Sequence, residues 1–359
     1  MKLTGTEGVF NNEISSSQMM LHENEESIQT NAEDRITERE DSGKDNSEIS
    51  TSAKTFKSVG EFLEKELKVS YLVEPLVVSN QINMIVGSSG SLKTTFSLCM
   101  VRCCLRQEKF LDMETRKLDS AIYINRDDPG CIIQDQLRRL GFNQNDKLFL
   151  WDLSDDQEPP RLDDACQIDE YMIAAKKFPL MIFDALAMFS SEKDENTVKD
   201  MSVIMSVLRK LCNLTTVILI HHAGKSQGSK IFRGSTHILD SAHVLLNLER
   251  VGDERVRLYC RKSKVAPIPK DKFLKIKYNH SDTSFNAEGW VTDDDEKLEV
   301  IRRIIERMES PSQSGIIDES PFSKIQSIHL LDIGEGKKWN KRKAEKKKFI
   351  YDVINTEDI

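Results

Sequence analysis

The chain has 359 residues, of which 38% are hydrophobic and 31% are charged, a composition typical of a globular protein with one α/β domain and smaller appendages. No stretch approaches about 18 consecutive apolar residues, and the first residues lack the apolar segment of a secretory signal, so neither a membrane protein nor a secreted protein is expected. The seven cysteines show neither metal-ligand spacing nor a disulfide framework, which predicts free, buried thiols in the cytoplasm.

The formal net charge of −8 is concentrated in residues 1–55, where twelve acidic and five basic side chains give −7. This segment is rich in Glu, Ser, Asn and Asp and has almost no aromatic residues. It cannot bury enough apolar surface to offset its ordering entropy, so we expect a disordered tail. A solvated tail is the simplest interpretation, with an interaction segment as the alternative. Because the rest of the chain is close to neutral, the overall acidity does not exclude a nucleic-acid partner.

From about residue 60, short apolar runs alternate with helical patterns. The runs are continuous, as in strands covered on both faces, and strands alternating with helices predict parallel βαβ units around a central sheet. The strand-like runs span 82–87, 121–125, 147–152, 180–185 and 216–222, and the helical patterns span 94–106, 131–140, 163–177 and 197–212. Runs at 243–250, 256–262 and 273–279, joined by short polar segments, predict an antiparallel extension at the sheet edge.

A glycine- and serine-rich segment joins the apolar run 82–87 to an apolar helix, which is the context that a phosphate-binding P-loop requires. Small residues let backbone N–H groups surround a β-phosphate at the positive end of the helix. Lys93 would reach the β- and γ-phosphates of ATP, and the Thr94 hydroxyl would bind Mg²⁺. An ordinary turn before a helix is the alternative. The candidate nucleotide-binding residues are Gly87, Ser88, Ser89, Gly90, Ser91, Leu92, Lys93, Thr94 and Thr95.

The loop departs from the pattern G-x-x-x-x-G-K-[ST] at one position, because Leu92 stands where the last glycine is expected. A P-loop ATPase also needs a carboxylate for Mg²⁺ at the end of a buried strand. Asp184 follows the apolar run 180–183 and is our candidate, with a helix N-cap as the alternative role.

Two histidines, His221 and His222, end the run 216–222. Adjacent residues of a strand point to opposite faces, so the two rings cannot easily chelate one metal, and no His, Cys or Asp cluster with zinc-like spacing lies nearby. We therefore reject a zinc site. A hydrogen bond from one of them, His222, to the γ-phosphate or the attacking water is the better interpretation, and the other histidine is expected to pack in the core.

Several motifs between about 71 and 279 resemble the RepA-like branch of the RecA-like P-loop ATPases, which includes hexameric replicative helicases of plasmids and phages. The matching segments are YLVE (71–74), NMIVG (83–87), YINRDDP (123–129), IHHAGK (220–225), FRGST (232–236), LDSAH (239–243) and LER (248–250). The resemblance implies a RecA-like α/β core with a mostly parallel sheet. It also places the catalytic base at the strand end after the P-loop helix, where this chain has Asp127 in place of the usual Glu. A turn aspartate before proline is the alternative.

The same resemblance makes Arg233 a candidate arginine finger that would act on the ATP of a neighbouring subunit. A loop salt bridge is the alternative role for this residue. Lys225 is a second candidate phosphate contact, and residues 223–233 would form a mobile loop that faces the ring channel and DNA. The two departures, Leu92 and Asp127, are compatible with slow hydrolysis, or with a nucleotide switch that hardly turns over.

The C-terminal region (293–359) follows the predicted tail (1–55) and α/β domain (56–292). After an acidic turn at 293–295 and before a Ser/Pro-rich linker at 310–314, we expect a helix with an apolar stripe of Leu298, Ile301, Ile304, Ile305 and Met308. This helix and the apolar run 325–333 also suggest a small winged-helix module.

Residues 337–348 hold eight positive charges and one negative charge. Such a cluster favours salt-dependent, sequence-independent binding to DNA or RNA, and Trp339 would be free to stack on an unpaired base. A solvated, partly helical face is the alternative.

These features together predict an ATP-driven motor on single-stranded DNA, a helicase or translocase assembled as a homo-oligomer, with a hexameric ring suspected. ATP would bind between Lys93, Thr94 and Asp184 of one subunit and Arg233 of the next. The alternative is a nucleotide-gated regulator or assembly factor with a protein partner, which the acidic tail and the two departures favour. A small-molecule kinase is disfavoured, because no acceptor site or lid is recognisable.

Overall fold

The structure is a computed structural model that describes residues 57–153, 158–164, 168–190, 198–222, 236–265, 268–344 and 349–354. The predicted acidic tail at 1–55 lies outside these ranges. The chain divides into two compact units, Met1–Glu66 and Leu67–Ile359. In the first unit, helix α2 (Val59–Leu63) begins after Ser58, whose side chain accepts a hydrogen bond from the Glu61 backbone N–H. No helix among the described residues is long and apolar enough to cross a membrane.

A nine-stranded sheet forms the centre of the second unit, with the strand order β11-β10-β9-β8-β3-β7-β6-β4-β5. Neighbouring strands from β8 to β5 are parallel, and those from β8 to β11 are antiparallel. This confirms the predicted mixed α/β fold with a mostly parallel sheet. The strands are β3 (Ile82–Gly87), β4 (Ala121–Asn125), β5 (Leu148–Trp151), β6 (Leu180–Asp184), β7 (Thr216–His222), β8 (Val244–Arg250), β9 (Arg255–Ser263), β10 (Lys272–Asn279) and β11 (Ser284–Thr292), preceded by a short pair, β1 (Tyr71–Val73) and β2 (Val77–Val78).

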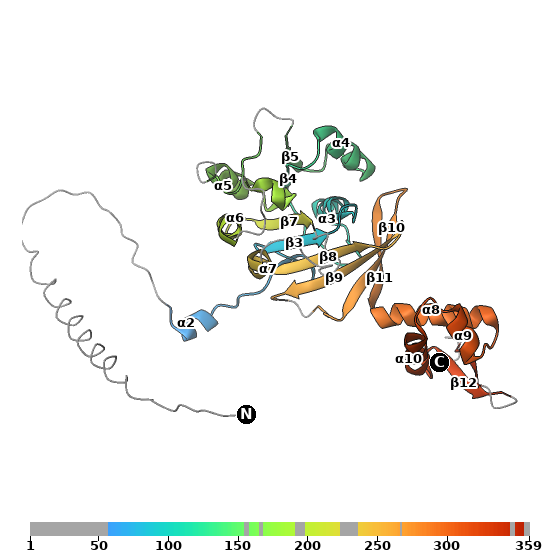
Figure 1. Ribbon diagram of the computed structural model, residues 1–359. Helices are drawn as coiled ribbons and strands as arrows, with labels where there is room; N and C mark the ends of the chain where they lie inside the picture. Colours follow the sequence, from blue (N-terminus) through green and yellow to red (C-terminus); the bar gives the residue numbers. More distant parts are fainter. Residues whose placement is uncertain are drawn as a thin grey trace, which may run out of the picture. The chain divides into compact units, whose positions relative to one another are not determined.

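Helices cover the two faces of the sheet (Figure 1). One face carries α3 (Lys93–Arg106) and α4 (Gly130–Arg139), and the other carries α5 (Ile168–Lys177), α6 (Val198–Leu211), α7 (Thr236–Ser241) and the 3₁₀ helix η1 (Leu186–Phe189). Successive residues of a strand point to opposite faces, so Ile182 of β6 packs in the α3 core whereas Met181 and Phe183 pack in the α6 core. This double coverage explains why the strand sequences are apolar without interruption.

Two predictions about the core are wrong, and one strand of the sheet was not predicted. Strand β5 lies at the sheet edge, and Phe149 and Leu150 are each 43% exposed, so the expected cover on both faces is wrong there. Strand β11 went unpredicted because its sequence, SFNAEGWVT, lacks a continuous apolar run; it is held instead by its ladder with β10. Cys131 is exposed on α4, although the other described cysteines are buried or half-buried.

The C-terminal module consists of α8 (Asp293–Met308), α9 (Gln313–Glu319), α10 (Lys324–Gly334) and the antiparallel hairpin β12 (Trp339–Lys343) with β13 (Phe349–Val353). Its own core contains Leu298, Ile301, Ile304, Ile305, Ile316, Leu330, Leu331, Trp339 and Tyr351. The predicted helix is confirmed, with its apolar stripe facing this core. Met308 packs against the cluster as a partly buried side chain.

Three expectations for this module are wrong. Residues 293–295 form the first turn of α8, because Thr292 caps the helix through a reciprocal pair of hydrogen bonds with Asp295. The Ser/Pro-rich segment is no open linker, since Pro311 is buried and α9 begins at Gln313. Trp339 is 0% exposed, and its indole N–H donates to the Leu331 carbonyl at 3.1 Å. Trp339 therefore serves the core of the module and cannot stack on a base.

Candidate nucleotide-binding site

The phosphate loop joins the end of β3 to the start of α3. A Cβ on Gly87 would lie 2.5 Å from the Leu248 carbonyl oxygen and 2.4 Å from Ser91 Oγ, so this position has room only for glycine. Leu92 has φ 67° and ψ 22°, the left-handed region that costs a side-chain-bearing residue about 1–2 kcal/mol. Leu92 therefore adopts, under strain, a conformation that the expected glycine reaches freely.

Lys93 and Thr94 open α3, and the Thr94 hydroxyl contacts Asp184 at the end of β6. The Lys93 ammonium donates to the Ser88 carbonyl at 2.9 Å, and burial lowers the pKa of Lys93 against the opposing effect of the Asp184 and Asp127 carboxylates. A bound polyphosphate would add negative charge beside this buried cation. In the structure, the Lys93 side chain therefore contacts the backbone of the phosphate loop.

Asp184 is almost completely buried at the end of β6. Its Oδ2 accepts hydrogen bonds from Thr94 Oγ1 at 2.6 Å and from the Tyr123 hydroxyl at 2.8 Å. Burial raises the pKa of Asp184, and these two hydrogen bonds act in the opposite direction. A hydroxyl and a carboxylate in contact are the hard oxygen ligands that Mg²⁺ prefers, with phosphate oxygens and water completing its shell. The residues present therefore fit a magnesium ion bound with a nucleotide.

Asp127 follows β4 in a turn organised by Asn125, whose side-chain oxygen accepts from the backbone N–H groups of Asp127 and Asp128 at 3.2 and 3.1 Å. The Asp127 carboxylate lies 3.6 Å from His222 Nε2. This contact with His222 lowers the pKa of Asp127, against the effect of burial. The structure thus brings a carboxylate that stays ionised at neutral pH beside an imidazole at the site edge.

His221 and His222 point to opposite faces of β7, as the sequence predicts: His221 is 1% exposed, whereas the His222 side chain is 43% exposed and lines the cavity. In β7 they lie opposite Val86 and Gly87 of β3. Within the described ranges, no group of three or more His, Cys, Asp or Glu side chains could hold a metal ion on its own.

A cavity of about 530 Å³ unites these groups. Some of its lining went unpredicted: Tyr278, His280 and Thr283 come from the β10–β11 hairpin, and Gln136 of α4 donates to Thr95 Oγ1 at 2.8 Å. No local motif marks these residues, since register and packing bring them to the P-loop from distant parts of the chain. The lining comprises Ser89, Gly90, Leu92, Lys93, Thr94, Thr95, Asp127, Asp128, Ile132, Asp135, Gln136, Arg139, Asp184, His222, Tyr278, His280 and Thr283.

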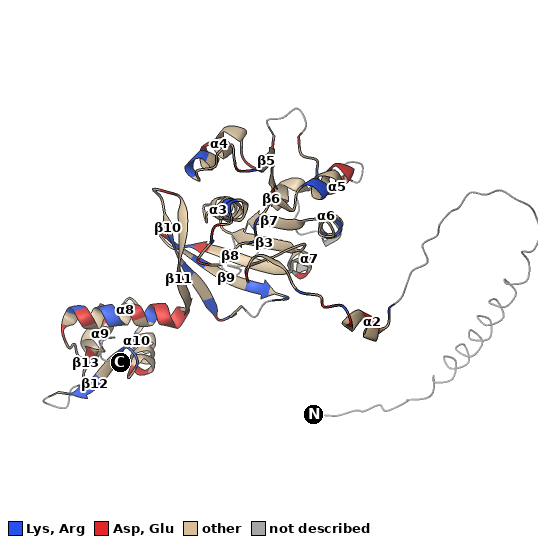
Figure 2. Ribbon diagram, turned by 180° about the vertical axis from the view of Figure 1, so that it is seen from behind, with Lys and Arg blue, Asp and Glu red and all other residues tan. Residues whose placement is uncertain are grey.

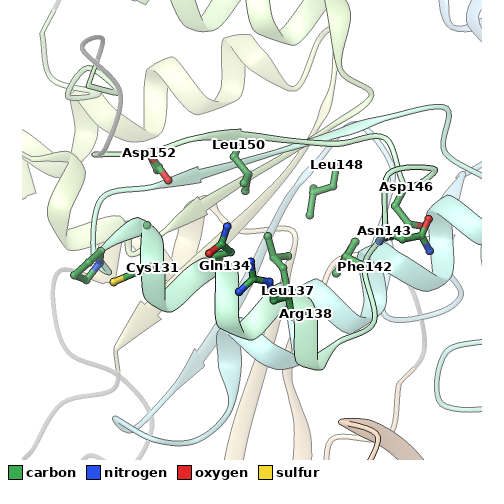
Figure 3. A pocket seen from close by; sticks show the side chains of 12 residues that line it. Cys131, Gln134, Leu137, Arg138, Phe142, Asn143, Asp146, Leu148, Leu150 and Asp152 are labelled. Carbon is green, nitrogen blue, oxygen red and sulfur yellow. Dashed lines mark hydrogen bonds between the residues drawn. The ribbon is translucent and has the colours of Figure 1, made fainter.

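A second cavity, of about 650 Å³, lies between α4 and the edge strand β5. Figure 3 shows Gln134, Leu137 and Arg138 of α4 opposite Leu148 and Leu150 of β5. Its lining includes no residue of the phosphate loop. One helix therefore forms a wall of both cavities, with different residues facing each.

The remaining predicted site residues lie outside the described ranges. These are Arg233, Lys225 and the rest of the loop 223–233. Their roles as arginine finger, phosphate contact and DNA-facing loop stay predictions.

Residues 50–228 match a family model described as an AAA domain, and this span includes the phosphate loop, Asp127, Asp184 and His222. The phosphate loop between β3 and α3, the mostly parallel sheet and the Thr94–Asp184 contact support a P-loop ATPase core, and the matched span agrees with this class. A solved KaiC-like protein from the hyperthermophilic archaeon Pyrococcus horikoshii OT3 is similar over 61% of this chain and 94% of that chain, with 14% identity and a TM-score of 0.45. No curated protein matches the chain.

Proposed function

We propose that the protein is an ATP-driven motor on single-stranded DNA, a ring-forming helicase or translocase of the RepA-like type. The observation that carries the ATPase part is the convergence of Lys93, Thr94 and Asp184 with Asp127 and His222 in one cavity. The motor part rests on the motifs that resemble RepA-like helicases, above all FRGST at 232–236.

In this proposal each residue has one task. Lys93 binds the β- and γ-phosphates, and Thr94 and Asp184 hold Mg²⁺, which when bound would neutralise charge on the phosphate oxygens. Asp127 accepts the proton of the attacking water, and His222 orients that water or the γ-phosphate. Arg233 of a neighbouring subunit would stabilise the transferring phosphoryl group. The loop 223–233 would contact single-stranded DNA and move along it during hydrolysis.

Hydrolysis of ATP, measured with and without single-stranded DNA, tests the proposal. We expect DNA to stimulate turnover. Lys93→Ala should abolish turnover and weaken ATP binding by at least about 100-fold, because a desolvated phosphate would lose its charged partner. Turnover that DNA does not change would contradict the motor.

A nucleotide-gated regulator with a protein partner is the second candidate, and two observations favour it. Asp127 is one methylene shorter than the usual Glu, and Leu92 holds a strained backbone in the phosphate loop. ATP-dependent oligomerisation, with slow turnover that DNA does not affect, would support this candidate over the motor.

A further inference from the structure

The C-terminal module has the element order of a helix-turn-helix followed by a hairpin. Helices α9 and α10 are joined by a short turn at 320–323, and β12–β13 follows α10 directly. Ser323 caps α10 by accepting from the Gln326 backbone N–H. The proposed ATPase mechanism uses none of these residues.

Helix α10 is fixed to the module by one face and exposes the other. Ser327, Leu330, Leu331 and Gly334 are buried, and a Cβ on Gly334 would lie 2.2 Å from the Trp339 ring. The opposite stripe carries Lys324, Ile325, Ile328, His329 and Asp332, spaced as neighbours on one helix face. Ile325 is 83% exposed. A rigidly held helix thus presents its first two turns to solvent.

The hairpin beside α10 is basic. Lys337 and Lys343 are exposed, as is Lys324 on α10, and none of the three forms an ion pair with a described carboxylate. Lys338, Lys341 and Arg342 contact Glu299, Glu335 and Asp352, respectively, but surface pairs of this kind contribute about 0–1 kcal/mol and exchange readily for a phosphate. Figure 2 shows Lys and Arg along β12, whereas α8 begins with Asp and Glu.

We propose that the C-terminal module binds double-stranded DNA, with the exposed stripe of α10 in the major groove and the β12–β13 hairpin against neighbouring phosphates. The major groove admits an α-helix, and in helix-turn-helix proteins the N-terminal residues of the second helix contact base edges. Lys324 would meet phosphate or guanine, and Ile325 would pack on a thymine methyl group. The basic hairpin supplies the salt-dependent part of the affinity.

The proposal is tested by measuring, in the absence of nucleotide, how tightly the full-length protein binds a labelled DNA duplex. A duplex of roughly 25 base pairs gives about two and a half helical turns. The same measurement on a single strand of equal length serves as the reference. Ile325→Glu places a negative charge in the expected groove contact and should weaken duplex binding by about tenfold or more. Ile173→Glu, on α5, is the matched control, because Ile173 is also an exposed helical isoleucine, at 68%.

A second pair of variants tests the hairpin. In the double variant Lys337→Ala/Lys343→Ala, the slope of log K for duplex binding against log salt concentration should become shallower by about 1.8, because each lost phosphate contact contributes about 0.9 to the slope. Lys117→Ala with Lys176→Ala removes the same charge from exposed positions of the ATPase core and should leave the dependence unchanged.

The proposal is overturned if Ile325→Glu binds the duplex as Ile173→Glu does, or if it weakens single-strand and duplex binding by the same factor. The second outcome would make the module a general polyanion surface. Lys93→Ala should bind the duplex normally, so an absence of DNA-stimulated hydrolysis would leave this test intact.

Discussion

The ATPase core and the C-terminal module both present cations suited to phosphate, but in contrasting environments. Lys93 is 5% exposed and lies in the electrostatic field of the Asp184 and Asp127 carboxylates, whereas Lys324, Lys337 and Lys343 stand in solvent on a helix and a hairpin. A desolvated cation binds a compact anion strongly at short range, and salt screens it little. Exposed cations bind weakly one by one, so they suit a long polyanion that engages many together. The buried lysine thus suits a nucleotide, whereas the exposed lysines suit a nucleic-acid polymer.

The largest effect should come from the group expected to act in the chemical step. Asp127→Asn removes the proposed base and should lower the turnover number about 10²–10⁴-fold. ATP binding should change little, because the carboxylate faces His222 in the structure. Stopped-flow binding of a fluorescent nucleotide and steady-state hydrolysis separate the two quantities.

Asp127→Glu refines this first test. If the short aspartate limits hydrolysis, the longer side chain should raise the turnover number. An Asp127→Asn variant with wild-type turnover would remove Asp127 from the mechanism and move the base elsewhere.

A smaller effect, confined to the C-terminal module, should follow from Gly334→Ala. The added Cβ overlaps the buried Trp339 ring, and overpacking of this kind costs about 1–3 kcal/mol. We expect an earlier urea transition in Trp fluorescence and weaker duplex binding, with DNA-independent hydrolysis unchanged.

Gly315→Ala is the matched control in the same module. Its Cβ would meet the flexible end of Met308 at 3.3 Å and the Ser312 hydroxyl at an ordinary contact distance of 3.6 Å, and alanine favours a helix by about 1 kcal/mol over glycine. If both glycine variants lose stability equally, the tight packing at Trp339 is not the cause.

The predictable part of the site comprises the residues at the carboxyl ends of parallel strands and the phosphate loop that follows one of them. Asp127, Asp184 and His222 lie at or just after the end of an apolar run, Lys93 follows β3 through the phosphate loop, and parallel strands bring their carboxyl ends to one edge of the sheet. His280 could not be predicted in the same way, because it reaches the cavity through an antiparallel hairpin whose register depends on pairing, with no local motif to mark it.

Trp339 illustrates the opposite error. Its basic neighbours suggested an exposed surface, yet residues of a strand alternate in direction, and Trp339 points inward while Asn340 points outward. A charge run identifies one face of a strand and says nothing of the other. The same reasoning explains the fold as a whole: apolar runs were predictable, whereas β11, with its mixed sequence, was not.

A third variant, Asp184→Asn, should raise the free energy of unfolding by about 1 kcal/mol while it impairs nucleotide binding. Burial raises the pKa of Asp184, so its ionised form destabilises the nucleotide-free fold. Asp184→Asn keeps an oxygen that can accept from Thr94 and Tyr123 and should therefore melt at higher temperature at pH 7. It should also lose Mg²⁺-dependent ATP binding.

The pH dependence of this stability advantage follows from the raised pKa of Asp184. As pH falls through the folded-state pKa, wild-type Asp184 takes up a proton and becomes neutral, so the advantage of Asp184→Asn should shrink. Melting temperatures measured across acidic and neutral pH check this. An advantage that stays constant over the range would assign the stabilisation to something other than charge burial.

The smallest effect concerns the strained residue that distinguishes this phosphate loop. Asparagine tolerates the left-handed region better than leucine, so Leu92→Asn should recover part of the strain, less than about 1 kcal/mol, while it loses the packing of Leu92 against the α3 core. Leu92→Ala loses the same packing without relieving the backbone. The difference in unfolding free energy between the asparagine and alanine variants therefore isolates the strain. If alanine is as stable as asparagine, the backbone at position 92 stores no strain, and slow turnover, should it be observed, must be traced to Asp127 alone.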